Sequence, residues 1–184
     1  MIARFVSAIL ENVAILLFVL AIVTSVLKLR RAGRRRIVAT AAYVFWGEIL
    51  FYGVGLVMLW AFLFHAFFQH IAASSIGWQP SPFEWELAWA ELGLAIVAML
   101  ALYRGFEMRL AATVAFVILA SGAAIQHVHQ LRCCHNYAPG NAGLVLWFND
   151  IFVSLTVLVL AFASRDAYER QSSRRNLTRG ARPL

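Results

Sequence analysis

The chain has 184 residues, of which 62% are hydrophobic and 14% are charged, and its formal net charge is +7. A soluble domain carries about 25% charged residues, so this composition excludes an ordinary soluble domain, and it also excludes a disordered chain, a coiled coil and a disulfide scaffold. The apolar residues come in blocks long enough to cross a bilayer, which takes about 20 residues. We therefore expect an integral membrane protein whose first partner is the lipid bilayer and whose basic residues mark cytoplasmic ends rather than a nucleic-acid interface.

Five charge-poor blocks are predicted to be membrane-spanning helices, which makes the fold an all-α transmembrane bundle. In chain order they are residues 4–27, 38–65, 83–103, 110–131 and 143–164. The connections after the first four blocks hold six, none, two and one Lys or Arg, and the tail holds six. Because positive loops stay in the cytoplasm, the N-terminus is predicted outside and the C-terminus inside. Residues 1–164 then form the transmembrane domain, and residues 165–184 form a basic cytoplasmic tail.

Two helix starts are predicted from capping patterns. Ser81, Pro82 and Glu84 fit a capping box, in which Ser caps the helix, Pro occupies the first turn and Glu reaches back to the cap. Glu84 is therefore predicted to be structural. Asn141 follows a Pro-Gly turn, so it is predicted to cap the fifth helix.

The ionisable residues gather on the predicted outer side of the bundle. Glu91 and Asp150 each follow a predicted helix start by nine or ten positions, which places them about 14 Å down their helices. Glu11, His65 and His127 approach the same depth from other helices. An ionisable residue inside a span costs at least a few kcal/mol, so by default it faces the bundle interior and has a partner there. The sequence thus predicts a shared polar cavity in the outer half of the membrane.

Several interpretations of this cluster remain open. The Glu and His side chains can pair as buried hydrogen bonds that only hold the helices together. They can instead bind iron, manganese, zinc or copper, for which the candidate ligands are His65, Glu91, His127 and Asp150. A proton or ion pathway and a small-molecule pocket are further alternatives. Haem held between His65 and His127 is less favoured.

Cys133 and Cys134 are adjacent in the predicted loop between the fourth and fifth spans. As thiolates beside His135 they would suit a soft metal such as copper or mercury. The simpler interpretation is a pair of unpaired loop cysteines.

Two motifs resemble a family of small bacterial membrane proteins known only as a domain of unknown function. The first is GWQPSPF at 77–83, followed by Glu86, and the second is NYAPGNAG at 136–143, followed by Asp150. The resemblance implies a multispanning protein of the bacterial inner membrane and supplies no activity. It adds weight to the matching positions, which are Glu11, His65, Glu86, His127, Asn136, Asn141 and Asp150.

The sequence therefore predicts an outer-facing polar cavity that binds or transports a small solute or metal ion. The expected lining residues are Glu11, His65, Glu86, Glu91, His127, Asn136, Asn141 and Asp150. A second hypothesis is a membrane redox enzyme or subunit that acts through a His and carboxylate metal site on a lipid-soluble substrate such as a quinone. A third is a non-catalytic assembly factor whose polar groups only lock the helices.

Overall fold

The computed structural model describes residues 12–31 and 38–180, and this part of the chain is helical without any strand. The all-α prediction is confirmed. The elements in chain order are α2 Val13–Arg31, α3 Val38–Glu48, the π-helix η1 Ile49–Leu56, α4 Val57–Phe67, α5 Gln69–Ser75, α6 Phe83–Ala101, α7 Phe106–Cys133, α8 Pro139–Ala142, the π-helix η2 Val145–Val153 and α9 Ser154–Gly180.

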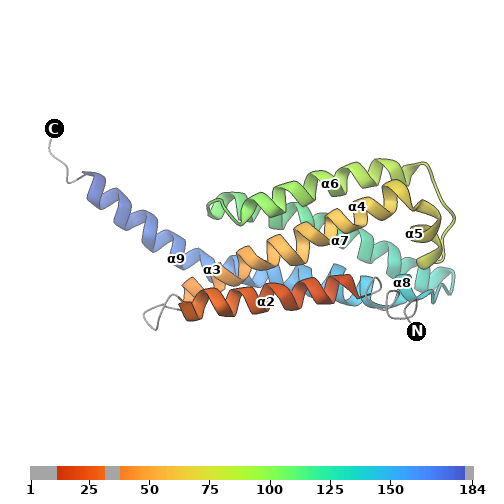
Figure 1. The fold of residues 1–184 in the computed structure, drawn as a ribbon, viewed down its shortest axis with the longest axis horizontal. Helices are drawn as coiled ribbons and strands as arrows, with labels where there is room; N and C mark the ends of the chain where they lie inside the picture. The colour runs from red at the N-terminus through yellow and green to blue at the C-terminus, as the bar shows by residue number, and fades with distance from the viewer. Residues whose placement is uncertain (1–11, 32–37, 181–184) are drawn as a thin grey trace.

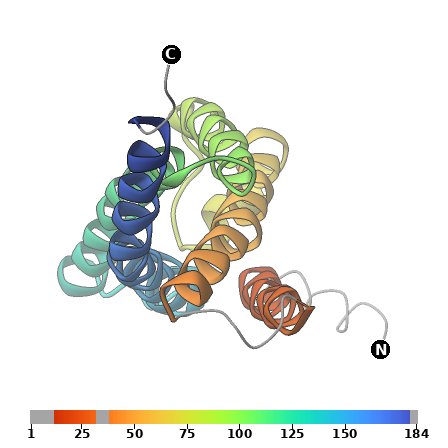
Figure 2. The ribbon, with the colours of Figure 1, turned by 90° about the vertical axis from the view of Figure 1, so that its left-hand side faces the viewer.

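The long helices lie side by side as an antiparallel bundle (Figure 1). α3, η1 and α4 form one continuous rod, and η2 continues into α9 in the same way. The short helices α5 and α8 lie together at one end of the bundle, where α2 begins, and α9 projects beyond the other end. Seen end on, α2 lies at the edge of the bundle, where it packs against α3 and η1 (Figure 2).

Four helices in the described part of the chain are long and apolar enough to cross a membrane. They cover Val13–Arg31, Ala41–Phe67, Phe106–Cys133 and Pro139–Arg165. The remaining predicted span is the 19-residue helix α6, which packs against α4 and η1 inside the bundle. α6 carries three glutamates, at positions 84, 86 and 91, and this charge separates it from the other four. The bundle is that of a membrane protein, while the fifth crossing stays a prediction.

Small residues allow the helices to approach closely in the core. Ala95 and Ala98 of α6 are fully buried, and Gly55 of η1 lies so near Met99 that an added Cβ would come within 2.6 Å of its Cγ. Close backbone approach of this kind is how helices associate where lipid removes the hydrophobic driving force.

The two predicted helix starts have different outcomes. The capping box is confirmed, because the Phe83 amide donates to Ser81 Oγ at 3.2 Å and the Ser81 amide donates to Glu84 Oε1 at 3.1 Å. The predicted cap at Asn141 is wrong. This residue lies inside the single turn of α8 and is fully buried, and its side chain bonds to α7 rather than to the start of the next helix.

Candidate functional site

Six of the eight predicted site residues are at least partly buried, and they form two groups. Glu11 lies outside the described residues, and Glu86 is exposed in the first turn of α6, so the structure does not bring it to either group. One group joins α4 to α6, and the other joins α7 to α8 and η2. Their members are His65 and Glu91 in the first group, and His127, Asn136, Asn141 and Asp150 in the second.

The first group is a closed pair. His65 Nδ1 lies 2.9 Å from Glu91 Oε1 and 2.8 Å from Glu91 Oε2. A proton on this nitrogen is thus shared by both carboxylate oxygens, and the Glu91 side chain is only 6% exposed. Glu91 lies eight residues after the start of α6, about 12 Å along the helix. This hydrogen-bonded pair links α4 to α6, as expected if Glu and His side chains pair only to hold the helices together.

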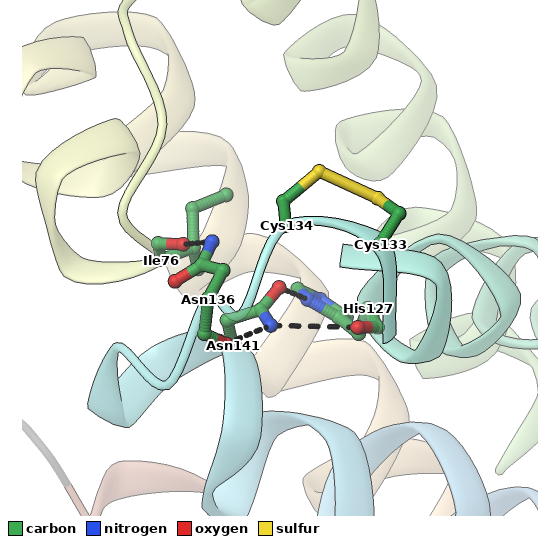
Figure 3. Close-up of a disulfide and its surroundings, with 6 residues drawn as sticks. All are labelled: Ile76, His127, Cys133, Cys134, Asn136 and Asn141. Atoms are coloured by element: carbon green, nitrogen blue, oxygen red, sulfur yellow. Dashed lines mark hydrogen bonds between the residues drawn. A yellow bond between two sulfur atoms is a disulfide. The ribbon is translucent and has the colours of Figure 1, made fainter. Parts of the chain in front are cut away.

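The second group starts from His127, which is buried near the end of α7. Its Nδ1 lies 2.8 Å from Asn141 Oδ1, and Asn141 Nδ2 donates to the Asn136 carbonyl at 2.9 Å (Figure 3). Asn136 Nδ2 in turn donates to the Ile76 carbonyl at 2.8 Å. These bonds join α7, the following loop, α8 and the end of α5. Since the amide oxygen of Asn141 only accepts, Nδ1 of His127 carries a proton.

Asp150 lies on η2 and faces the other side of the same imidazole ring. Its Oδ1 accepts a hydrogen bond from Asn149 Nδ2 at 3.0 Å, while its Oδ2 is buried without a hydrogen-bond partner. Oδ2 is 3.9 Å from His127 Nε2, which is beyond hydrogen-bond distance. In the neutral ring Nε2 is an acceptor, because Nδ1 holds the proton. Two buried acceptors therefore face each other across a gap.

Two further oxygens near Asp150 were not predicted from the sequence. Asn149 Oδ1 and Ser154 Oγ are buried in residues that are 8% and 5% exposed, and neither has a hydrogen-bond partner in the described structure. The segment from Val145 to Val153 is a π-helix, a form that is rare and frequent at functional sites. The adjacent Asn149 and Asp150 in an apolar block were a readable signal, but nothing in the sequence distinguishes Ser154 from an ordinary serine of a span.

The predicted metal ligands fall into two separate pairs rather than one cluster. Over residues 12–31 and 38–180, no three His, Cys, Asp or Glu side chains come together in a group that could hold a metal ion. The less favoured alternative, haem held between His65 and His127, also gains no support, because each ring binds its own partner, Glu91 or Asn141.

Cys133 and Cys134 form a disulfide between neighbouring residues at the end of α7 (Figure 3). The prediction of two unpaired cysteines is wrong. Both residues are exposed, and the bonded sulfurs leave no thiolates for a soft metal.

Two open hollows of the described surface lie away from these polar groups. One of about 760 Å³ is lined by Phe106, Glu107, Leu110, Ala111, Val114, Ala115, Ile118 and Tyr168. Another of about 270 Å³ lies on η2 and α9, lined by Phe152, Leu155, Thr156, Val159 and Leu160. Neither contains a predicted site residue.

Arg109 is a buried charge that the sequence analysis assigned to a cytoplasmic connection. The predicted span began one residue later, whereas α7 begins at Phe106, so the arginine lies in its first turn. Its Nε donates to the Ala101 carbonyl at 3.1 Å, Nη2 to the Leu102 carbonyl at 3.0 Å and Nη1 to the Tyr43 carbonyl at 2.6 Å. It thereby ties the start of α7 to the end of α6 and to α3.

Glu48 has a comparable partner at the same end of the bundle. Lys28 of α2 lies 2.5 Å from Glu48 Oε1, and the Glu48 side chain is only 3% exposed. This ion pair ties α2 to the end of α3.

A comparison with family models gives one match, described as "Family of unknown function (DUF6790)", over residues 11–170. The chain belongs to this family. The DUF6790 match covers every predicted site residue from Glu11 to Asp150, which confirms the expected membership of an uncharacterised family. No curated protein and no solved structure matches the chain. Any function must therefore be argued from the geometry.

Proposed function

We propose that this DUF6790 protein binds and transports a small cation, a proton or a metal ion, at His127 and Asp150. The proposal includes five crossings of the bacterial inner membrane, with the N-terminus outside. The site then lies in the outer half of the bilayer, since Asp150 follows the end of α8 by eight residues, about 12 Å along the helix.

The observation that carries the proposal is the gap of 3.9 Å between His127 Nε2 and Asp150 Oδ2. Both residues are about 95% buried, and in the neutral ring both atoms are acceptors. A buried acceptor without a donor costs about 1–3 kcal/mol, and more if it is charged. A proton or a cation placed at the gap removes this cost, which supports a cationic ligand.

The His65–Glu91 pair provides the contrast within the same molecule. There the ring nitrogen and the carboxylate are in direct contact at 2.8 Å, so no unpaired acceptor faces the imidazole. A purely structural role fits that pair, but it does not explain the open geometry at Asp150. Intramembrane carboxylate and histidine groups commonly mark ion and proton pathways.

The proposal is tested with purified protein reconstituted into vesicles on a solid-supported membrane. Concentration jumps of protons, sodium, potassium, magnesium and zinc are applied in turn, and the charge displacement is recorded. We expect a current for at least one of these ions. It should be abolished by Asp150→Asn, which keeps the size of the side chain and removes its charge.

Glu169→Gln is the matched control, because it removes a carboxylate that is exposed and paired with Arg165 near the opposite end of the bundle. This variant should give the wild-type current. The absence of any current for all five ions, or an undiminished current in Asp150→Asn, would refute the proposal.

A further inference from the structure

We propose that the bound ion is an alkali-metal cation held by three side-chain oxygens at the junction of η2 and α9. The three atoms are Asn149 Oδ1, Asp150 Oδ2 and Ser154 Oγ. This inference rests on the proposed function, because it names the ion that the site takes. It also names the ligands of the ion, among which His127 is a neighbour rather than the main ligand.

The three oxygens share one property: each is buried and lacks a hydrogen-bond partner in the described structure. Their residues are 8%, 5% and 5% exposed. Asp150 and Ser154 are four residues apart, so their side chains lie on the same face of the helix. Asn149 Nδ2 donates to Asp150 Oδ1 at 3.0 Å, which holds the Asn149 amide against the same carboxylate.

The donor atoms define the chemical class of the ion. Carboxylate, amide and hydroxyl oxygens are hard ligands that suit alkali and alkaline-earth cations, whereas thiolate and several imidazoles suit zinc, copper or iron. No group of three His, Cys, Asp or Glu side chains occurs in the described residues, so the ligand set typical of a transition metal is not assembled around Asp150.

Charge decides between a monovalent and a divalent ion. Among the three donor residues only Asp150 can be negative, and the neutral form of His127 that donates from Nδ1 to Asn141 adds no charge. A monovalent cation therefore gives a neutral buried site. A divalent ion would leave one uncompensated positive charge in the interior, and an uncompensated buried charge is strongly destabilising.

The test is thermal unfolding of the full chain in detergent, followed by tryptophan fluorescence. Sodium chloride, potassium chloride and choline chloride are compared at equal ionic strength, so that screening is the same in each. At ten times its dissociation constant, the bound cation should raise the unfolding temperature by about 3–6 °C over choline. Magnesium chloride at the same ionic strength should give no rise.

Two serine variants separate the site from a general effect of salt. Ser154→Ala removes one proposed ligand and should abolish the difference between the alkali cations and choline. Ser164→Ala is the control, because Ser164 Oγ is also buried and unpaired but lies ten residues further along α9, about 15 Å away. This control should keep the full shift. Ser154→Ala preserves the carboxylate, so the test stands even if Asp150→Asn fails to fold.

The inference is overturned if neither sodium nor potassium raises the unfolding temperature over choline, or if the rise persists in Ser154→Ala. A current carried only by protons, magnesium or zinc, together with no alkali-dependent shift, would remove this inference and leave the proposed function intact. If no ion gives a current and no cation shifts unfolding, both proposals fail.

Discussion

Asn141 is the residue whose replacement should most clearly disturb the packed end of the bundle. It is fully buried and bonds through both ends of its amide: Oδ1 to His127 Nδ1 at 2.8 Å and Nδ2 to the Asn136 carbonyl at 2.9 Å. Leu is a suitable replacement, because it fills a similar volume without any polar atom. Asn141→Leu therefore removes the hydrogen bonds without leaving a large empty space at this position.

The magnitude follows from the groups that lose their partner. The His127 N–H becomes a buried donor without an acceptor, which costs about 1–3 kcal/mol. Loss of the bond to the half-buried Asn136 carbonyl costs about 0.5–1.5 kcal/mol. Asn141→Leu should therefore lower the free energy of unfolding by about 2–4 kcal/mol, a large part of the 5–15 kcal/mol typical of a folded protein.

The assay is unfolding of the detergent-solubilised protein by titration with sodium dodecyl sulfate, followed by circular dichroism. Gln126→Leu is the matched control, since it removes an exposed side-chain amide next to His127 and should change the unfolding free energy by less than about 0.5 kcal/mol. If the unfolding free energy of Asn141→Leu is within about 0.5 kcal/mol of the wild-type value, the hydrogen bonds of Asn141 do not stabilise the fold and the reasoning is refuted.

Three further predictions concern the rest of the bundle. Arg109→Met removes three charge-assisted hydrogen bonds and should cost about 3–5 kcal/mol in the same titration. Arg104→Met, at an exposed position, should cost less than about 0.5 kcal/mol, and equal effects of the two variants would contradict the assigned role of Arg109. Gly55→Ala should destabilise the protein by about 1–3 kcal/mol, because the added methyl group overpacks the contact with Met99. Gly122→Ala is the control: its added Cβ meets no atom within 4 Å, so it should be neutral or stabilising by up to about 1 kcal/mol. Destabilisation by both variants would refute the packing argument. Because the C-terminus is predicted to be cytoplasmic, a phosphatase reporter fused after Leu184 should be inactive, and a reporter that fluoresces only in the cytoplasm should be active. The opposite pattern would contradict the predicted orientation.

The sequence by itself determined the class of protein and the course of the long helices. Apolar blocks and their charged borders follow directly from the cost of placing charge in lipid, so they are readable without tertiary information. The capping box at Ser81 was readable for the same reason, because its hydrogen bonds are local. Boundaries were less accurate, as Arg109 shows: the predicted span began one residue after this arginine, yet its side chain is buried in the first turn of α7.

Only the tertiary structure decided which polar groups meet. His65 and His127 belong to equally apolar helices, but one binds Glu91 directly and the other binds Asn141 and leaves a gap to Asp150. These partners are 26, 14 and 23 residues apart in the chain. Their distances depend on how far each helix slides and rotates against its neighbours, and on the π-helical segment η2 that carries Asp150. Hydrophobic periodicity shows which face of a helix is apolar. It carries no information on how far one helix slides or rotates against the next.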